Sequence, residues 1–169
     1  PRANIAGYML QRDHLFDWRT IEQNALLGLE VKKRLNAETH AYAAELLDRY
    51  GLGAFKDYYP RQLSGGMKQK AALIRTLAFS PELLLLDEPA AGMNPQETLE
   101  LADFIKEIRD HFHKTILLIE HHMDLVMGIA DRIYVLDFGK LIAKGTPEEI
   151  QNNERVIDAY LGVAEDAED

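Results

Sequence analysis

The sequence predicts an α/β fold on a mostly parallel sheet, with a helical subdomain inserted near its start. From residue 63 onward, short apolar runs alternate with longer stretches of helical periodicity, whereas the stretch from about 14 to 62 shows helical periodicity alone. We therefore expect four parts: a strand and loop of the core over 1–13, a helical subdomain over 14–62, the remaining α/β core over 63–163, and a frayed acidic tail over 164–169.

The first third of the chain contains one expected strand and two expected helices. Residues 5–10 are apolar and lead into a polar segment, 11–13, as a buried strand does when it delivers a loop to the C-terminal edge of a sheet. Two apolar stripes of helical spacing lie between 20 and 50, with a break near 32–37. Glycine and proline then predict a loop over 51–60.

The middle of the chain alternates between helix and strand. A helix opens at Ser64-Gly65-Gly66 and ends before Pro81, and the apolar run Leu83–Leu86 predicts a buried strand. Asn94-Pro95-Gln96-Glu97 combines an N-cap, a proline at the first helical position and a glutamate placed for a capping box. The helix that follows leads to another expected strand over 115–119.

The last third predicts a helix, a hairpin and a further helix. The short helix covers 123–130, and the two strands of the hairpin cover 132–137 and 141–143 with the turn at Phe138-Gly139. Thr146-Pro147-Glu148-Glu149 caps the final predicted helix by the same device as before.

Composition excludes several classes of protein. The net charge of −9 disfavours a general nucleic-acid-binding face. The chain has no cysteine, which excludes disulfides and thiolate metal sites and suits the cytoplasm. No apolar run approaches the roughly 20 residues that cross a bilayer.

Two segments carry the pattern of a chemical site. Asp87 and Glu88 follow the apolar strand, where Asp87 could hold Mg²⁺ and Glu88 could polarise a water, although a solvated acidic turn is the commoner meaning of this pattern by itself. Ser64-Gly65-Gly66 offers a hydroxyl and backbone N–H groups to an anion at a helix N-terminus; the plain alternative is an N-cap with a flexible turn. Two glycines there weaken the helix by about 1 kcal/mol each, which suggests that something approaches the backbone closely.

Taken together, these segments resemble the ATPase subunits of ATP-binding-cassette (ABC) transporters along essentially the whole chain. Leu63–Met67 is similar to the signature loop of the family, with Met67 where glutamine is commoner, and Leu83–Glu88 is similar to its Walker B strand. Gln11 resembles the Q-loop glutamine, and His121 resembles the switch histidine at a strand end.

The resemblance implies a P-loop NTPase sheet, ATP and Mg²⁺ as cofactors, and two cassettes that face each other head to tail. It also implies membrane permease subunits as partners, no nucleic acid, and a place in the cytoplasm on the inner face of the cell membrane. The implied roles are general base for Glu88, contact with the γ-phosphate for His121, metal binding for Asp87 and Gln11, and a grip on the partner's nucleotide for Ser64, Gly65 and Gly66.

The chain departs from the family pattern at three places. Asn94 stands where the D-loop usually has aspartate, and His122 stands where aspartate often follows the switch histidine. No Gly-x-x-x-x-Gly-Lys-[Ser/Thr] occurs, so the P-loop is absent. We therefore expect a fold truncated at the N-terminus, whose start at Pro1 is a cut or a processing product. Such a chain should bind ATP poorly by itself and expose apolar surface or an unpaired strand edge.

The two halves resemble different importers. Segments 7–13 and 18–20, and the chain on to residue 80, are similar to nitrate, sulfonate or taurine importers. Segments 87–95, 119–121 and 159–162 are similar to branched-chain amino-acid importers. We therefore expect a recombined or engineered chain, or a subfamily that neither of these two groups of importers defines.

The neighbourhood of the Q-loop leaves two alternatives open. His14, Phe16 and Trp18 lie where a coupling helix of the permease docks in the family, but a Phe-x-Trp pair is equally well explained as core of the helical subdomain.

Other functions fit the sequence less well. Asp137-Phe138-Gly139 lacks the other motifs of a protein kinase, and the histidines at 111, 113, 121 and 122 lack the spacing and the cysteines of a metal site. The chromosome-maintenance and DNA-repair relatives of the fold need a long coiled-coil insert, for which this chain is too short. A non-catalytic fragment, split half or engineered chimera that needs a partner to supply the P-loop remains the alternative to a transporter ATPase.

Overall fold

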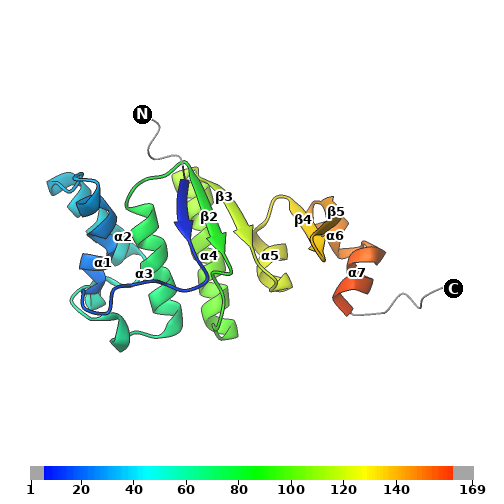
Figure 1. The fold of residues 1–169 in the computed structure, drawn as a ribbon, viewed down its shortest axis with the longest axis horizontal. Helices are drawn as coiled ribbons and strands as arrows, with labels where there is room; N and C mark the ends of the chain where they lie inside the picture. Colours follow the sequence, from blue (N-terminus) through cyan, green and yellow to red (C-terminus); the bar gives the residue numbers. More distant parts are fainter. Residues whose placement is uncertain (1–5, 162–169) are drawn as a thin grey trace. The chain divides into compact units, whose positions relative to one another are not determined.

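The computed structural model describes residues 6–161, and Figure 1 shows their fold. The chain divides into two compact units, Pro1–His121 and His122–Asp169. Residue 5 of the first expected strand, the chain start, and the expected acidic tail over 164–169 lie outside the described residues. The sequence-based boundaries at residues 13, 62 and 163 stay a prediction.

The first unit is built on a three-stranded parallel sheet in the order β1-β2-β3. Its strands are β1 (Ala6–Met9), β2 (Leu83–Asp87) and β3 (Thr115–Ile119). All three predicted strands are therefore present, and long helical crossovers separate them in the sequence, as parallel pairing requires. The predicted α/β class is confirmed.

Four helices accompany this sheet: α1 (Ile21–Val31), α2 (Ala37–Arg49), α3 (Gly65–Leu77) and α4 (Pro95–Phe112). Short 3₁₀ turns at Gly53–Phe55 and Pro60–Gln62 shape the connection from α2 to α3. In Figure 1, α3 lies between the α1–α2 pair and the sheet. The capping box predicted at the start of α4 is present, because the side chains of Asn94 and Glu97 each accept a hydrogen bond from the other's backbone N–H.

The core of the first unit lies on one face of the sheet. Met9, Leu84 and Leu86 are buried on that face, together with Leu73, Ile74, Leu77, Leu101, Ile105 and Ile108 of α3 and α4. On the alternate strand positions, Tyr8, Leu117 and Ile119 are more than half exposed. One face of the sheet thus carries the packing, while the other presents apolar side chains outward.

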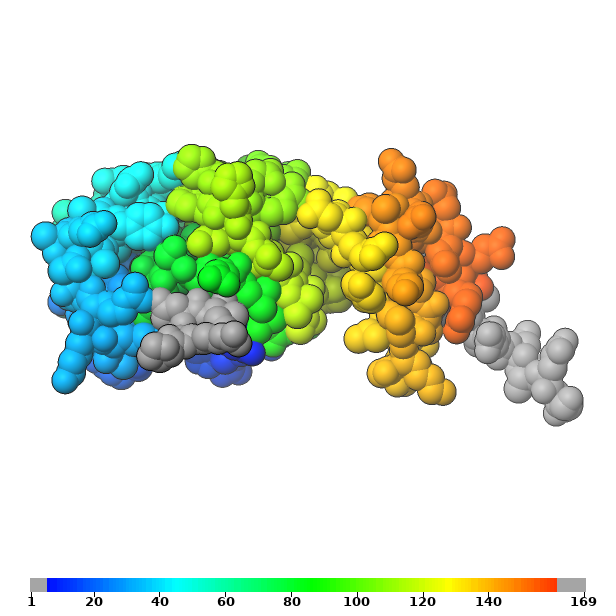
Figure 2. All heavy atoms as spheres, turned by 90° about the horizontal axis from the view of Figure 1, so that it is seen from above, coloured from blue at the N-terminus to red at the C-terminus, as the bar shows by residue number. Residues whose placement is uncertain are grey.

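A second contact region joins α2 to α4. Figure 2 shows these two segments side by side on one face of the molecule. Arg49 donates from Nε to Glu107 Oε1 at 2.6 Å, and the rings of Tyr50 and Phe104 lie 3.7 Å apart between centroids. The end of the helical pair is therefore fastened to the helix that follows β2.

The second unit contains α5 (Met123–Ile129), an antiparallel hairpin, α6 (Pro147–Gln151) and α7 (Glu154–Leu161). The hairpin consists of β4 (Ile133–Asp137) and β5 (Lys140–Gly145), so its second strand is longer than predicted. Phe138 and Gly139 form the predicted turn with φ of 42° and 77°, the pattern of a two-residue type I′ connection. Within residues 6–161, no helix combines the length and the apolar character that crossing a bilayer requires.

Candidate functional site

Three predicted site residues meet where the three parallel strands end. Gln11 follows β1, Glu88 follows β2 and His121 follows β3, so the sheet delivers all three to one edge. Gln11 Nε2 donates to Glu88 Oε2 at 2.5 Å, and His121 Nδ1 lies 3.7 Å from Glu88 Oε1. The carboxylate of Glu88 is thus the centre of this group, and Asp87 precedes it at the half-buried end of β2.

The backbone of Glu88 lies in the left-handed region, with φ of 43°. For a residue other than glycine, this conformation costs on the order of 1–3 kcal/mol and persists only where the surroundings hold it. Here the amide N–H of Glu88 donates to the carbonyl oxygen of Ile119 at 2.8 Å, which continues the pairing of β2 and β3 past Asp87. The sheet therefore fixes the point from which the Glu88 side chain leaves the chain.

Glu120, which the sequence did not indicate as a site residue, stabilises this edge of the sheet through hydrogen bonds to two backbone N–H groups. Its side chain is fully buried. Oε1 accepts a hydrogen bond from the backbone of Ala90 at 3.0 Å, and Oε2 accepts one from the backbone of His121 at 2.9 Å. The carboxylate therefore connects the loop after β2 with the loop after β3 and orients the segment that carries His121. The only feature of the sequence that could have indicated this role is the position of Glu120 directly before His121.

Helix α3 holds the loop that carries Gln11. Gln69 Nε2 donates to the carbonyl oxygen of Gln11 at 2.9 Å. Arg75 donates to the carbonyl oxygens of Asp13 and His14 at 2.8 and 2.7 Å. Burial lowers the pKa of Arg75, and the charge of Asp13 acts in the opposite direction. The position of Gln11 is thus set by side chains from a helix more than fifty residues further along the chain.

The start of α3 contains the predicted anion-binding segment, and a carboxylate from α4 contacts it. Ser64 caps the helix, because its Oγ accepts a hydrogen bond from Met67 N–H at 3.2 Å. The same hydroxyl donates to Glu97 Oε1 at 2.9 Å, and the N–H of Gly66 donates to that oxygen at 3.3 Å. The sequence indicated Glu97 only as a helix cap, so its contact with this loop is new.

The oxygen donors at the strand ends suit a magnesium ion. The carboxylates of Asp87 and Glu88 and the side-chain amide of Gln11 supply the hard oxygen ligands that Mg²⁺ prefers. The Gln11–Glu88 hydrogen bond already brings two of these three side chains into contact.

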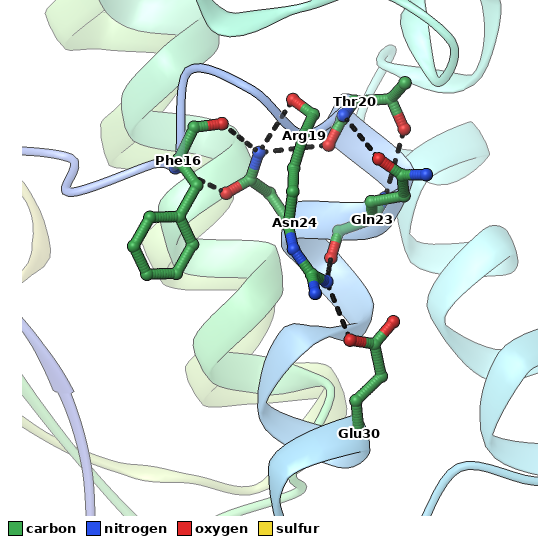
Figure 3. Close-up of polar contacts among 6 residues, drawn as sticks. All are labelled: Phe16, Arg19, Thr20, Gln23, Asn24 and Glu30. Carbon is green, nitrogen blue, oxygen red and sulfur yellow. Dashed lines mark hydrogen bonds and ion pairs between the residues drawn. The ribbon is translucent and has the colours of Figure 1, made fainter.

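A polar knot around Asn24 orders the segment that leads from the Gln11 loop into α1, as Figure 3 shows. The buried Asn24 side chain accepts from Phe16 N–H at 2.7 Å and donates to the carbonyl oxygens of Phe16, Arg19 and Thr20 at 3.0–3.1 Å. Trp18 is 72% exposed, so the interpretation of Trp18 as subdomain core is wrong. Its ring lies 4.7 Å from that of Phe16.

A cavity of about 360 Å³ opens beside this segment. Its lining combines cationic and aromatic side chains with a glycine of α1: His14, Phe16, Gly28, Lys32, Arg75 and Phe79. The site therefore has three parts: the Glu88 group at the strand ends, the loop at the start of α3, and an apolar and basic hollow next to an exposed tryptophan.

Comparison with known sequences gives two family matches. The ABC transporter family matches residues 2–91, more than half of the chain. A family described as branched-chain amino acid ATP-binding cassette transporter matches residues 140–166.

Individual relatives are ATP-binding proteins of importers. The chain is 48% identical over 141 residues to the high-affinity branched-chain amino acid transport ATP-binding protein LivG of Salmonella typhimurium, which covers 83% of this chain and 55% of LivG. It is 40% identical over 144 residues to the methionine import ATP-binding protein MetN of Caulobacter vibrioides, covering 85% of this chain and 43% of MetN. It is 35% identical over 165 residues to the sulfate/thiosulfate import ATP-binding protein CysA of Nocardia farcinica, covering 96% of this chain and 50% of CysA. The chain thus spans about half the length of these relatives.

Proposed function

Because this chain belongs to the ABC transporter family, we propose that it forms part of the ATP-hydrolysing subunit of an importer, in which hydrolysis drives solute uptake through a membrane permease. The observation that carries the proposal is the convergence of Gln11, Glu88 and His121 at the ends of three adjacent parallel strands. A carboxylate held between an amide and an imidazole at this edge has the arrangement that activation of a water molecule requires.

In the proposed reaction, Glu88 accepts a proton from the water that attacks the γ-phosphorus of ATP, while the bond from that phosphorus to the β–γ bridging oxygen breaks and ADP leaves. The bond from Gln11 and the backbone pairing with Ile119 orient its carboxylate. His121 stabilises the phosphoryl group. The Glu120 carboxylate orients His121 by accepting a hydrogen bond from its backbone N–H. Asp87 and Gln11 would hold Mg²⁺, which neutralises phosphate charge when it is bound.

Ser64, Gly65 and Gly66 grip the nucleotide of a second cassette in a head-to-tail pair. This role is supported by their place at the N-terminus of α3, a helix of 13 residues with no acidic residue in its own first turn. Backbone N–H groups there point along the helix axis and favour a negatively charged oxygen.

The phosphate cradle is supplied by residues outside these 169. The sequence contains no Gly-x-x-x-x-Gly-Lys-[Ser/Thr] motif, and the chain spans about half of relatives that are ATP-binding proteins. We therefore expect weak ATP binding by the 169-residue chain and hydrolysis once a P-loop segment is joined to it. A purely structural role in assembly is the second candidate, favoured by the same missing motif.

We place the permease at the segment that Asn24 orders. The exposed Trp18 and the adjacent cavity form an apolar and basic surface that suits a short helix of a membrane partner. The matches at residues 140–166 and to LivG favour branched-chain amino acids as the transported class. The subunit then lies in the cytoplasm, on the inner face of the membrane.

The test measures ATP hydrolysis by the chain alone and by the chain joined to a P-loop segment. In the joined protein, Glu88→Gln should lower the rate by at least about 10²-fold, the usual effect of losing a general base. Glu38→Gln, at an exposed position in the first turn of α2, is the matched control and should retain the rate. An unchanged rate in Glu88→Gln would show that the base is wrongly assigned, and tight ATP binding by the chain alone would show that no further cradle is needed.

A further inference from the structure

The carboxylate of Glu97 occupies the donors of the loop formed by Ser64, Gly65 and Gly66. One oxygen, Oε1, accepts from Ser64 Oγ at 2.9 Å and from Gly66 N–H at 3.3 Å. The other, Oε2, accepts from Asn94 N–H at 3.2 Å. Glu97 therefore uses the same hydroxyl and the same backbone N–H that the proposed function assigns to a nucleotide phosphate.

The two glycines of this loop differ in what surrounds them. A Cβ atom added at Gly66 would lie 2.9 Å from both Cδ and Oε1 of Glu97, closer than real Cβ contacts allow. A Cβ atom added at Gly65 would meet only the carbonyl oxygen of Gly92, at 4.0 Å. The two glycines suggested that some group approaches the backbone of this loop closely. At Gly66 that group is the Glu97 carboxylate of the same chain.

Charge favours this arrangement. The first turn of α3 has no acidic residue of its own, so Glu97 places a negative charge from α4 at the positive end of α3. The bonds from Asn94, Ser64 and Gly66 lower the pKa of Glu97, against desolvation and the nearby charge of Glu100. Glu100 in turn pairs with Lys70 of α3 at 2.7 Å. Glu97 is therefore ionised at neutral pH.

We propose that Glu97 is a built-in competitor for the anion-binding loop at the start of α3, which must leave Ser64 and Gly66 before a phosphate can bind there. The proposal rests on the nucleotide-binding role given to this loop above. When the carboxylate leaves, the hydrogen bond from Asn94 N–H to Glu97 Oε2 can break as well. Asn94 Oδ1 still caps α4, because it accepts from Glu97 N–H at 2.9 Å. The Glu97 side chain therefore connects phosphate binding at Ser64 and Gly66 with the backbone N–H of Asn94.

The first experiment examines the internal contact without any ligand. In a pH titration of the ¹⁵N-labelled 169-residue chain followed by NMR, the Gly66 amide should shift together with the Glu97 carboxyl, with a midpoint below the ordinary glutamate range. Glu97→Gln should remove this shift, and Ser64→Ala should move the midpoint upward because one bond to the ionised form is lost. A Gly66 amide that ignores the titration of Glu97 would overturn the proposal.

The second experiment adds inorganic tripolyphosphate and follows the same amide. Glu97→Gln keeps an oxygen acceptor of the same shape but removes the charge, so tripolyphosphate should half-saturate the Gly66 shift at an about three- to tenfold lower concentration than in the unmodified chain. Glu100→Gln is the matched control, since it makes the same change of charge one turn further along α4, and it should leave the half-saturation within about twofold of the unmodified chain.

The outcomes separate the two proposals. Equal half-saturation for the unmodified chain and Glu97→Gln would overturn the competitor role while leaving the nucleotide grip intact. If tripolyphosphate shifts Gly66 in neither protein, and ATP fails to do so in the chain joined to a P-loop segment, the grip itself is refuted and the competitor role falls with it. Dispersed spectra of Glu97→Gln and Ser64→Ala would confirm that both variants fold.

Discussion

Asn24 has no exposed surface, and its side-chain amide makes four hydrogen bonds to the backbone of residues 16–20. Asn24→Ala removes all four. Two of the backbone groups keep a second partner, because the carbonyl oxygen of Phe16 also accepts from Arg19 N–H and that of Thr20 accepts from the backbone N–H of residue 24. The N–H of Phe16 and the carbonyl oxygen of Arg19 lose their hydrogen bonds to the side chain of residue 24.

The magnitude follows from these four bonds. With about 0.5–1.5 kcal/mol for each net hydrogen bond, and a larger cost for a buried group left unpaired, Asn24→Ala should lower the free energy of unfolding of the first unit by about 3 kcal/mol. Asn24→Asp should lower it further, because a carboxylate would then face three carbonyl oxygens in a buried position.

Urea unfolding followed by far-UV circular dichroism measures this change, and hydrogen exchange at Phe16 localises it. Asn36→Ala is the control, since Asn36 caps α2 at an exposed position and its loss should cost about 1 kcal/mol. If Asn24→Ala lowers the free energy of unfolding no more than Asn36→Ala does, the hydrogen bonds of Asn24 do not hold the segment that carries Trp18. The permease would then not dock on a surface that Asn24 orders.

Four further outcomes follow from the structure. Gly66→Ala should displace the Glu97 carboxylate from the start of α3, because an added Cβ atom would lie 2.9 Å from Cδ and Oε1 of Glu97; Glu97→Ala should therefore change the melting temperature less in the Gly66→Ala background than in the unmodified chain. Phe138→Asn should stabilise the hairpin by about 0.5–1 kcal/mol, because asparagine suits the left-handed turn position that a 99% exposed phenylalanine now occupies; an unchanged melting temperature would contradict this. Burial raises the pKa of Tyr50 to about 12, so Tyr50 leaves the free energy of unfolding independent of pH below pH 10 and lowers it as the pH rises toward 12; absorbance at 295 nm should show late-titrating phenols from Tyr50 and from Tyr42, whose pKa burial also raises, and Tyr50→Phe should remove the one near 12. Among the described residues the Tyr50 hydroxyl is buried without a hydrogen-bond partner, so the same variant should unfold at an equal or higher urea concentration.

Local features were the most accessible to prediction. The strands at β2 and β3 are apolar runs bounded by turn residues, and the starts of α4 and α6 carry complete capping boxes, so their positions depend on neighbours only three residues away. Phe138-Gly139 predicted the hairpin for the same reason, although the greater length of β5 depends on pairing with β4.

Contacts between distant segments could not be derived in this way. The bond between Ser64 and Glu97 spans 33 residues and depends on how α3 packs against α4, which no local pattern specifies. Gln11, Glu88 and His121 could be placed at one edge of the sheet because parallel strands end together, but the distances among them depend on strand register and on the left-handed turn at Glu88. Asn24 shows why a polar residue within an amphipathic helix is ambiguous, since its partners lie in the loop before that helix.

Helix α3 gives two separate loops a single rigid support. Its first residues carry the Ser64–Gly66 loop, whereas Gln69 and Arg75, on later turns, hold the backbone of the loop that contains Gln11. Thirteen helical residues form a rod about 20 Å long, too stiff for one end to tilt without displacing the other. A displacement of the Gln11 loop would therefore tilt α3 as a whole. That tilt would change the direction of the N–H groups in the Ser64–Gly66 loop without changing the conformation of the helix between the two loops.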